Sequence, residues 1–158
     1  MGKPSRDTWV LGVDPGKSGG MAWVGCGVGA RKMPDTERDV WEFFQRGAFG
    51  EHFALIEKVH AMPGQGVTSM FNFGVSYGQL RMALIAASIP FETVSPAKWQ
   101  RSFGLPTLKD AGSGTAKKNA HKAKAQELFP SLRVTHAIAD ALLIAEYGRR
   151  TRAGGSDA

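Results

Sequence analysis

Short apolar runs and longer helically spaced stretches alternate along the chain, which predicts interleaved strands and helices. The predicted strands occupy residues 9–14, 21–24, 30–33, 53–57 and 91–94. The first two are joined by a glycine-containing turn at residues 17–20 and are interpreted as a hairpin. The uninterrupted apolar run that begins at Phe53 is typical of a strand covered on both faces.

Helical spacing and N-cap signals predict the remaining elements. Five helices are predicted. The first ends near Arg46, the second spans residues 69–87, and the third begins at Pro96. The fourth carries the lysines of residues 117–124, and the last runs from Thr135 through Tyr147. Residues 105–115 are rich in Gly, Ser and Asp and are interpreted as a mobile loop, and residues 151–158 as a disordered tail. The order predicts a single α/β domain over residues 1–150, with a mixed sheet and helices on both faces.

Three acidic residues occur inside elements whose other residues favour burial. Asp14 ends the first apolar strand, Glu57 ends the strand that begins at Phe53, and Asp140 lies within the last helix. A lone ionised carboxylate is costly to bury, so these positions suggest that a cation compensates the charge. Mg²⁺ is the simplest candidate, because it binds a few carboxylates and completes its shell with water and phosphate oxygens. The pattern therefore favours phosphodiester chemistry.

The composition also favours a polyanionic binding partner. The sequence has 20 Lys and Arg against 14 Asp and Glu, a formal net charge of +6. Four lysines and no acid lie between Lys117 and Lys124, and a second basic group comprises Arg149, Arg150 and Arg152. For either group alone, a merely solvated surface is an equally good interpretation.

Other features indicate the compartment. The N-terminal residues lack the apolar core of a signal peptide, and no apolar run approaches the length that spans a membrane. The single cysteine, Cys26, permits no intramolecular disulfide. We therefore expect a reducing, cytoplasmic compartment and no membrane partner.

Four motifs, taken in order, resemble those of RuvC-type Holliday junction resolvases. They lie at residues 11–16, 54–57, 96–99 and 139–143. The resemblance covers residues 9–150, and the loop at residues 61–66 makes the chain most similar to the short phage-encoded branch. It implies an RNase H-like fold, a homodimer and two coordinated nicks across a four-way DNA junction.

The resemblance also implies roles for the acidic residues. Asp14 is expected to bridge two Mg²⁺ ions, which Mn²⁺ can replace, while Glu57 and Asp140 complete the two sides. Two such ions activate a water and stabilise the departing 3′ oxygen. Members of the family carry Asp or His shortly before the last aspartate, and His136 lies four residues before Asp140, on the same helix face. His136 is therefore the predicted fourth ligand or general base.

DNA contacts are predicted along the lysine-rich helix and in the loop after Glu57. Residues expected to follow one DNA strand are Lys117, Lys118, His121, Lys122 and Lys124. Three residues after Glu57, where some resolvases place an aromatic residue that stacks on junction bases, this chain has His60. Gln65 in the following loop is a further predicted contact.

The helix predicted at residues 69–87 raises two further questions. Phe71 and Phe73 could stack on bases in place of His60, but helical aromatic residues are more often part of the core. Gly74 and Gly78 lie one turn apart and allow close approach of another backbone. That backbone belongs either to a second subunit, as the resemblance suggests, or to the sheet.

Several alternatives remain open from the sequence. Sugar kinases and actin-like ATPases also carry an aspartate before a glycine turn, but they require two lobes that 158 residues do not supply. A closer alternative is an RNase H-like nuclease that acts on RNA or on another branched or duplex substrate. A non-catalytic nucleic-acid-binding module is a third, although it leaves the three carboxylates unexplained.

Overall fold

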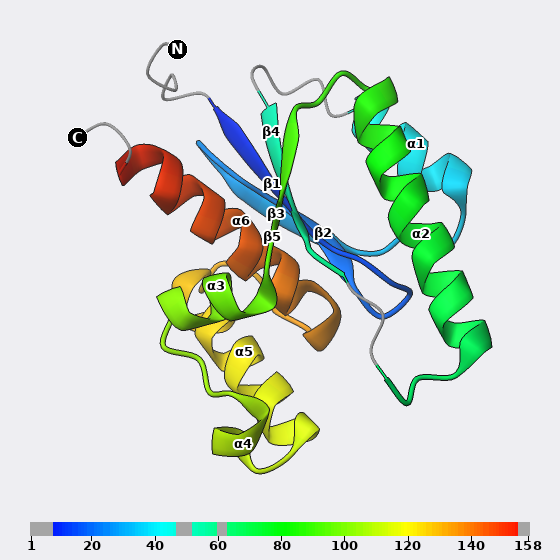
Figure 1. The fold of residues 1–158 in the computed structure, drawn as a ribbon. Coiled ribbons are helices and arrows are strands. Elements are labelled where there is room, and N and C mark those ends of the chain that lie inside the picture. Colours follow the sequence, from blue (N-terminus) through cyan, green and yellow to red (C-terminus); the bar gives the residue numbers. More distant parts are fainter. Residues whose placement is uncertain (1–7, 47–51, 60–62, 155–158) are drawn as a thin grey trace.

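The computed structural model describes residues 8–46, 52–59 and 63–154, which form a mixed sheet between two helical layers (Figure 1). The strands are β1 (Trp9–Asp14), β2 (Gly20–Val24), β3 (Val28–Lys32), β4 (His52–Glu57) and β5 (Phe91–Val94). The helices are α1 (Glu37–Arg46), α2 (Val67–Ala86), α3 (Pro96–Ser102), α4 (Leu108–Ala111), α5 (Gly114–Leu128) and α6 (His136–Gly154). The strand order is β3-β2-β1-β4-β5, with β2 antiparallel and β4 parallel to β1. The predicted hairpin, third strand and mixed sheet are confirmed.

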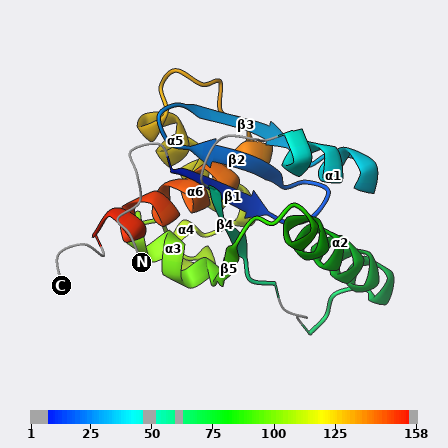
Figure 2. The same cartoon turned by 90° about the horizontal axis from the view of Figure 1, so that it is seen from above.

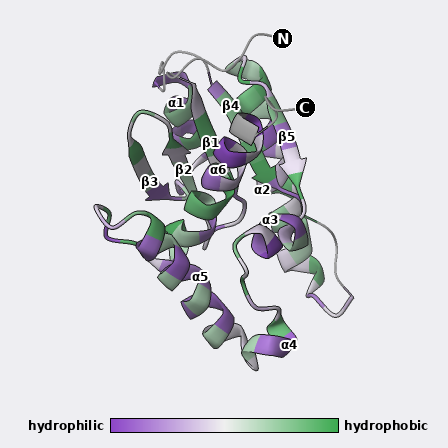
Figure 3. Ribbon diagram, turned by 90° about the vertical axis from the view of Figure 1, so that its left-hand side faces the viewer, coloured by the Kyte–Doolittle hydropathy of each residue, from purple (hydrophilic) through white to green (hydrophobic). Residues whose placement is uncertain are grey.

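Side chains of the central strands point alternately to the two faces of the sheet, and this divides the core into two halves. Leu11 and Val13 of β1 pack with residues of α1 and α2, whereas Val10 packs with α6. Seen from above, α1 and α2 cover one face of the sheet, and α3, α5 and α6 lie on the other (Figure 2). The helices α4 and α5 extend away from the sheet (Figures 1 and 3). Because successive strand residues point to opposite faces, Asp14 lies on the α6 side, like Val10.

The predicted mobile loop at residues 105–115 is wrong in part, because it contains α4. Thr107 and Asp110 form a reciprocal capping box at the start of this helix. Gly112 ends the helix with a left-handed φ of 78°. Residues 105–107 and 112–113 connect this turn to α3 and α5. The Ser and Asp residues that suggested a loop therefore include helix caps.

The predicted disordered tail is also wrong for its first residues, since α6 continues to Gly154. Residues 155–158 lie outside the described part of the chain. Arg149 and Arg150 both donate to the buried carboxylate of Glu146, and the guanidinium of Arg152 lies 3.2 Å from the ring centre of Phe53. The C-terminal arginine group thus stabilises the fold.

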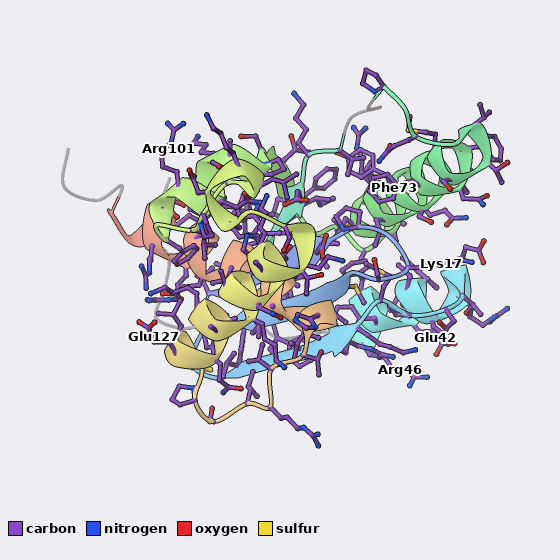
Figure 4. All side chains as sticks on the ribbon, turned by 90° about the horizontal axis from the view of Figure 1, so that it is seen from below. Lys17, Glu42, Arg46, Phe73, Arg101 and Glu127 are labelled. Atoms are coloured by element: carbon purple, nitrogen blue, oxygen red, sulfur yellow. The ribbon has the colours of Figure 1, made fainter. Side chains whose placement is uncertain are left out.

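The outer face of α2 is apolar although it is exposed. Its exposed apolar side chains are Val67 (86%), Phe71 (70%), Val75 (42%), Met82 (58%) and Ile85 (57%). At 100° per residue these positions fall within one stripe, together with Gly74 and Gly78. The interpretation of Phe71 as a core residue is therefore wrong, while Phe73 is half-buried and its ring lies close to Gly16. Figure 4 shows Phe73 on α2 and Lys17 in the turn opposite it.

Within residues 8–46, 52–59 and 63–154, no helix combines the length and the apolar character needed to cross a membrane.

Candidate active site

The two strand carboxylates are brought together by the register of β1 and β4. Val13 pairs with Ile56 in this parallel pair, so the next residue of each strand, Asp14 and Glu57, lies at the same edge of the sheet. Both side chains are half-buried. The apolar runs before them enter the core and fix the two strand ends side by side.

The third carboxylate is supplied by α6, which crosses the same face of the sheet. Gly12 makes this possible, because a Cβ there would overlap the backbone of Ala141 and Ala145. A Cβ at Gly20 in β2 would likewise overlap the carbonyl oxygen of Ala137. These glycines let the helix backbone approach the strands and carry Asp140 to the strand ends. A glycine in the middle of a central apolar strand is the sequence signal for this contact.

The three carboxylates interact electrostatically in the folded chain. Burial raises the pKa of Asp14 well above its usual range, and the charges of Asp140 and Glu57 raise it further. Burial also raises the pKa of Glu57 to about 7, with Asp140 adding to the rise. Each shift means that the ionised form is disfavoured by the fold. The group therefore concentrates negative charge that a cation would neutralise.

Two buried rings contact these carboxylates from the helical layer. The indole nitrogen of Trp99 donates to Glu57 Oε2 at 2.7 Å. His121 Nδ1 lies 2.7 Å from Asp140 Oδ1. The sequence interpretation missed both contacts, because Trp99 and Glu57 are 42 residues apart and His121 and Asp140 are 19 residues apart. No helical or strand periodicity links such pairs.

The predicted role of His121 as an exposed DNA contact is wrong. Its side chain is 4% exposed and contacts Asp140 and the ring of Trp99. Residues that face one way on an isolated helix cannot be assigned to solvent or core by periodicity alone. Here α5 packs against α6, and His121 lies between them.

The structure separates the lysines of α5 into two kinds. Lys118 is exposed and its charge lowers the pKa of Asp14, while the charge of partly exposed Lys117 lowers that of Glu57. Lys122 is partly exposed. Lys124 instead binds both carboxylate oxygens of Glu127, at 3.1 and 2.9 Å. The N-terminal half of α5 is thus the positively charged border of the carboxylate group.

The other predicted site residues are distributed as follows. His136 is the first residue of α6, is exposed, and has Nε2 2.9 Å from the side-chain oxygen of Asn119 on α5. Its role as ligand or general base stays a prediction. Gln65 is exposed in the loop before α2. His60 lies outside the described residues.

The donor set fits a hard divalent cation. Among the described residues, no three His, Cys, Asp or Glu side chains are arranged to enclose a metal ion by themselves. Mg²⁺ does not require this, because it keeps several waters and binds one or two carboxylates plus substrate phosphates. Burial, and to a lesser degree the neighbouring carboxylates, raise the pKa of Asp14 and Glu57, so a bound cation would favour their ionised forms.

Comparison with known proteins identifies the fold. The sequence matches no protein-family model and no curated protein sequence. The structure is similar to Thermus thermophilus RuvC in complex with a Holliday junction substrate, with a TM-score of 0.62 and 16% identity over 92% of this chain and 97% of that one. A second Thermus thermophilus RuvC structure gives a TM-score of 0.57 and 20% identity over 90% and 96% of the two chains. The chain therefore has the fold of RuvC, and the predicted RNase H-like α/β class is confirmed.

Proposed function

We propose that this protein is a metal-dependent endonuclease that resolves four-way DNA junctions by paired, symmetric nicks. The observation that carries this proposal is the meeting of Asp14, Glu57 and Asp140 on one edge of a RuvC-like sheet, bordered by Lys117 and Lys118. Thermus thermophilus RuvC has been solved with a Holliday junction substrate. The same fold with three coupled carboxylates supports the same class of reaction here.

The residues have distinct tasks in this mechanism. Asp14, Glu57 and Asp140 would hold two Mg²⁺ or Mn²⁺ ions, and bound metal would supply an activated water and charge neutralisation at the phosphate. Lys117 and Lys118 attract the DNA backbone toward the carboxylates. His136, one turn before Asp140, is proposed to assist as a fourth ligand or as a base.

The apolar stripe on α2 favours a dimer, and a dimer with two active sites suits a four-way junction better than a single duplex. A helix that is apolar on all sides is normally buried, yet one face of α2 is exposed from Val67 to Ile85. A Cβ added at Gly74 or Gly78 would meet no heavy atom of the described residues within 4 Å, so a second backbone can approach there. We propose that a second copy of the chain covers this stripe. A two-fold dimer supplies the two active sites that symmetric incision requires.

The substrate is tested by comparing cleavage of a four-way junction, linear duplex, RNA–DNA hybrid and RNA at matched salt and Mg²⁺. We expect the junction to be bound and cut well above the other substrates, and a cruciform plasmid to be opened by paired incisions. Preferential cleavage of hybrid or RNA would instead support an RNase H-like nuclease. Binding without metal-dependent cleavage of any substrate would support a non-catalytic module.

The lysines of α5 give a separate prediction about binding. Changing Lys118 and Lys122 together to Ala is expected to weaken junction affinity by about tenfold and to flatten its dependence on salt, because each phosphate contact releases counterions. Junction affinity measured from low to moderate salt tests this. Lys124→Ala is the matched control in the same helix, since its ammonium is already paired with Glu127. Equal effects of the double variant and the control would contradict a DNA path along Lys118 and Lys122 of α5.

A further inference from the structure

Trp99 is a fully buried residue whose indole N–H donates a hydrogen bond to a carboxylate. Its side chain is 0% exposed in α3, and its indole N–H donates to Glu57 Oε2 at 2.7 Å. A hydrogen bond to an ionised group is stronger and more directional than one between neutral groups. The same bond lowers the pKa of Glu57 against the larger effect of burial. The indole therefore favours one orientation of the charged Glu57 side chain.

His121 has the corresponding relation to the third carboxylate. Nδ1 lies 2.7 Å from Asp140 Oδ1, and toward an ionised carboxylate, which only accepts, the tautomer with the proton on Nδ1 would donate. The other ring nitrogen, Nε2, is buried and has no hydrogen-bond partner among the described residues. Burying an unpaired polar nitrogen costs free energy that an aliphatic side chain would avoid. Packing alone does not account for a histidine at this position.

The two rings also contact each other. Their centroids are 5.4 Å apart at an interplanar angle of 73°, an edge-to-face arrangement. Trp99 comes from α3 and His121 from α5, and both helices pack on α6. Figure 4 shows these helices, which carry the labelled Arg101 and Glu127, on the same side of the molecule. The contact links two side chains, each of which contacts a different carboxylate.

We propose that Trp99 and His121 are positioning residues that together fix the Glu57 and Asp140 carboxylates for metal binding and cleavage. This inference rests on the proposed function, because it assigns the two rings to that same site. Carboxylates that bind metal are themselves oriented by hydrogen bonds, and loss of such a partner typically costs about 10- to 100-fold in metal affinity or activity. Trp99 contacts Glu57 and His121 contacts Asp140, so removing either ring frees one carboxylate from a contact that orients it.

The test uses substitutions that separate hydrogen bonding from packing. Trp99→Phe keeps an aromatic ring but removes the donor. Its matched control is Trp41→Phe, at a partly exposed position in α1. His121→Asn retains a donor close to the position of Nδ1, whereas His121→Leu fills the space without one. If the ring served only packing, Leu would be tolerated better than Asn in this buried position.

Two readouts are measured: the junction nicking rate against Mg²⁺ concentration, and the Mn²⁺ dissociation constant of the DNA-free protein by titration calorimetry. We expect Trp99→Phe and His121→Leu to lower the rate and weaken Mn²⁺ binding by about 10- to 100-fold. Trp41→Phe should match wild type and His121→Asn should stay within about fivefold, with junction affinity in chelator unchanged throughout.

Wild-type Mn²⁺ affinity and rate in Trp99→Phe and His121→Leu would overturn the inference, as would an Asn variant as impaired as the Leu variant. If His121→Leu does not fold, the comparison of Trp99→Phe with Trp41→Phe decides the case. A wild-type protein that cuts no junction would overturn the proposed function. The Mn²⁺ affinities would still decide whether the two rings position the carboxylates.

Discussion

Replacing Asp14 by Asn is expected to lower junction cleavage by about a thousandfold while leaving junction binding intact, since metal stabilisation of a transition state is worth several kcal/mol. Glu57→Gln and Asp140→Asn should have the same result, because all three carboxylates belong to one charged group. Nicking by each purified variant is measured beside gel-shift affinity for the same junction. The exposed Asp35→Asn serves as the matched control. Full activity in any one of the three site variants would break the two-metal assignment.

The Asp14→Asn variant has a second expected result in the absence of metal. Burial and its acidic neighbours raise the pKa of Asp14, so its ionisation costs folding free energy that accumulates as pH rises above the ordinary pKa of an aspartate. At pH 8 in chelator, the uncharged Asn should therefore raise the melting temperature. Mg²⁺ should then raise the melting temperature of wild type more than that of the variant. A variant that melts below wild type in chelator would contradict the assigned charge repulsion.

Met82→Glu on α2 is expected to prevent the proposed dimer from forming and to leave a monomer that cannot make paired incisions. Met82 is 58% exposed within the apolar stripe, and an unpaired charge buried in an interface costs about 3 kcal/mol or more, over a hundredfold in the dissociation constant. Sedimentation over a range of protein concentrations measures the association. A cruciform plasmid assay separates single nicks from paired ones.

Leu108→Glu is the matched control for this substitution. Leu108 is also 58% exposed, but it lies on α4, away from the stripe. It should leave the sedimentation of the protein unchanged. Wild-type protein that sediments as a monomer, or a Met82→Glu variant that remains a dimer with paired incisions, would remove α2 as the contact between copies.

The sequence determined the strand framework and the two strand-end carboxylates. Apolar runs before Asp14 and Glu57 can be satisfied only in a covered sheet, so both the strands and their ends were predictable. The apolar residues around Asp140 also indicated that it belongs to an element whose other residues favour burial. Turn and cap chemistry was less reliable, because the Ser and Asp residues that favour loops also cap helices, as Asp110 does at α4 and Ser113 does at α5.

Only the tertiary structure decided which side chains contact the carboxylates and which helix face is left exposed. Trp99 and His121 approach Glu57 and Asp140 because α3 and α5 pack on α6, a relation between distant segments that no local period encodes. Conversely, α2 is apolar on both faces, and the sequence could not show which face meets the sheet. The sequence by itself thus determined the elements and the acidic residues at their ends. Packing between those elements decided which histidine is buried beside a carboxylate and which apolar face is left exposed.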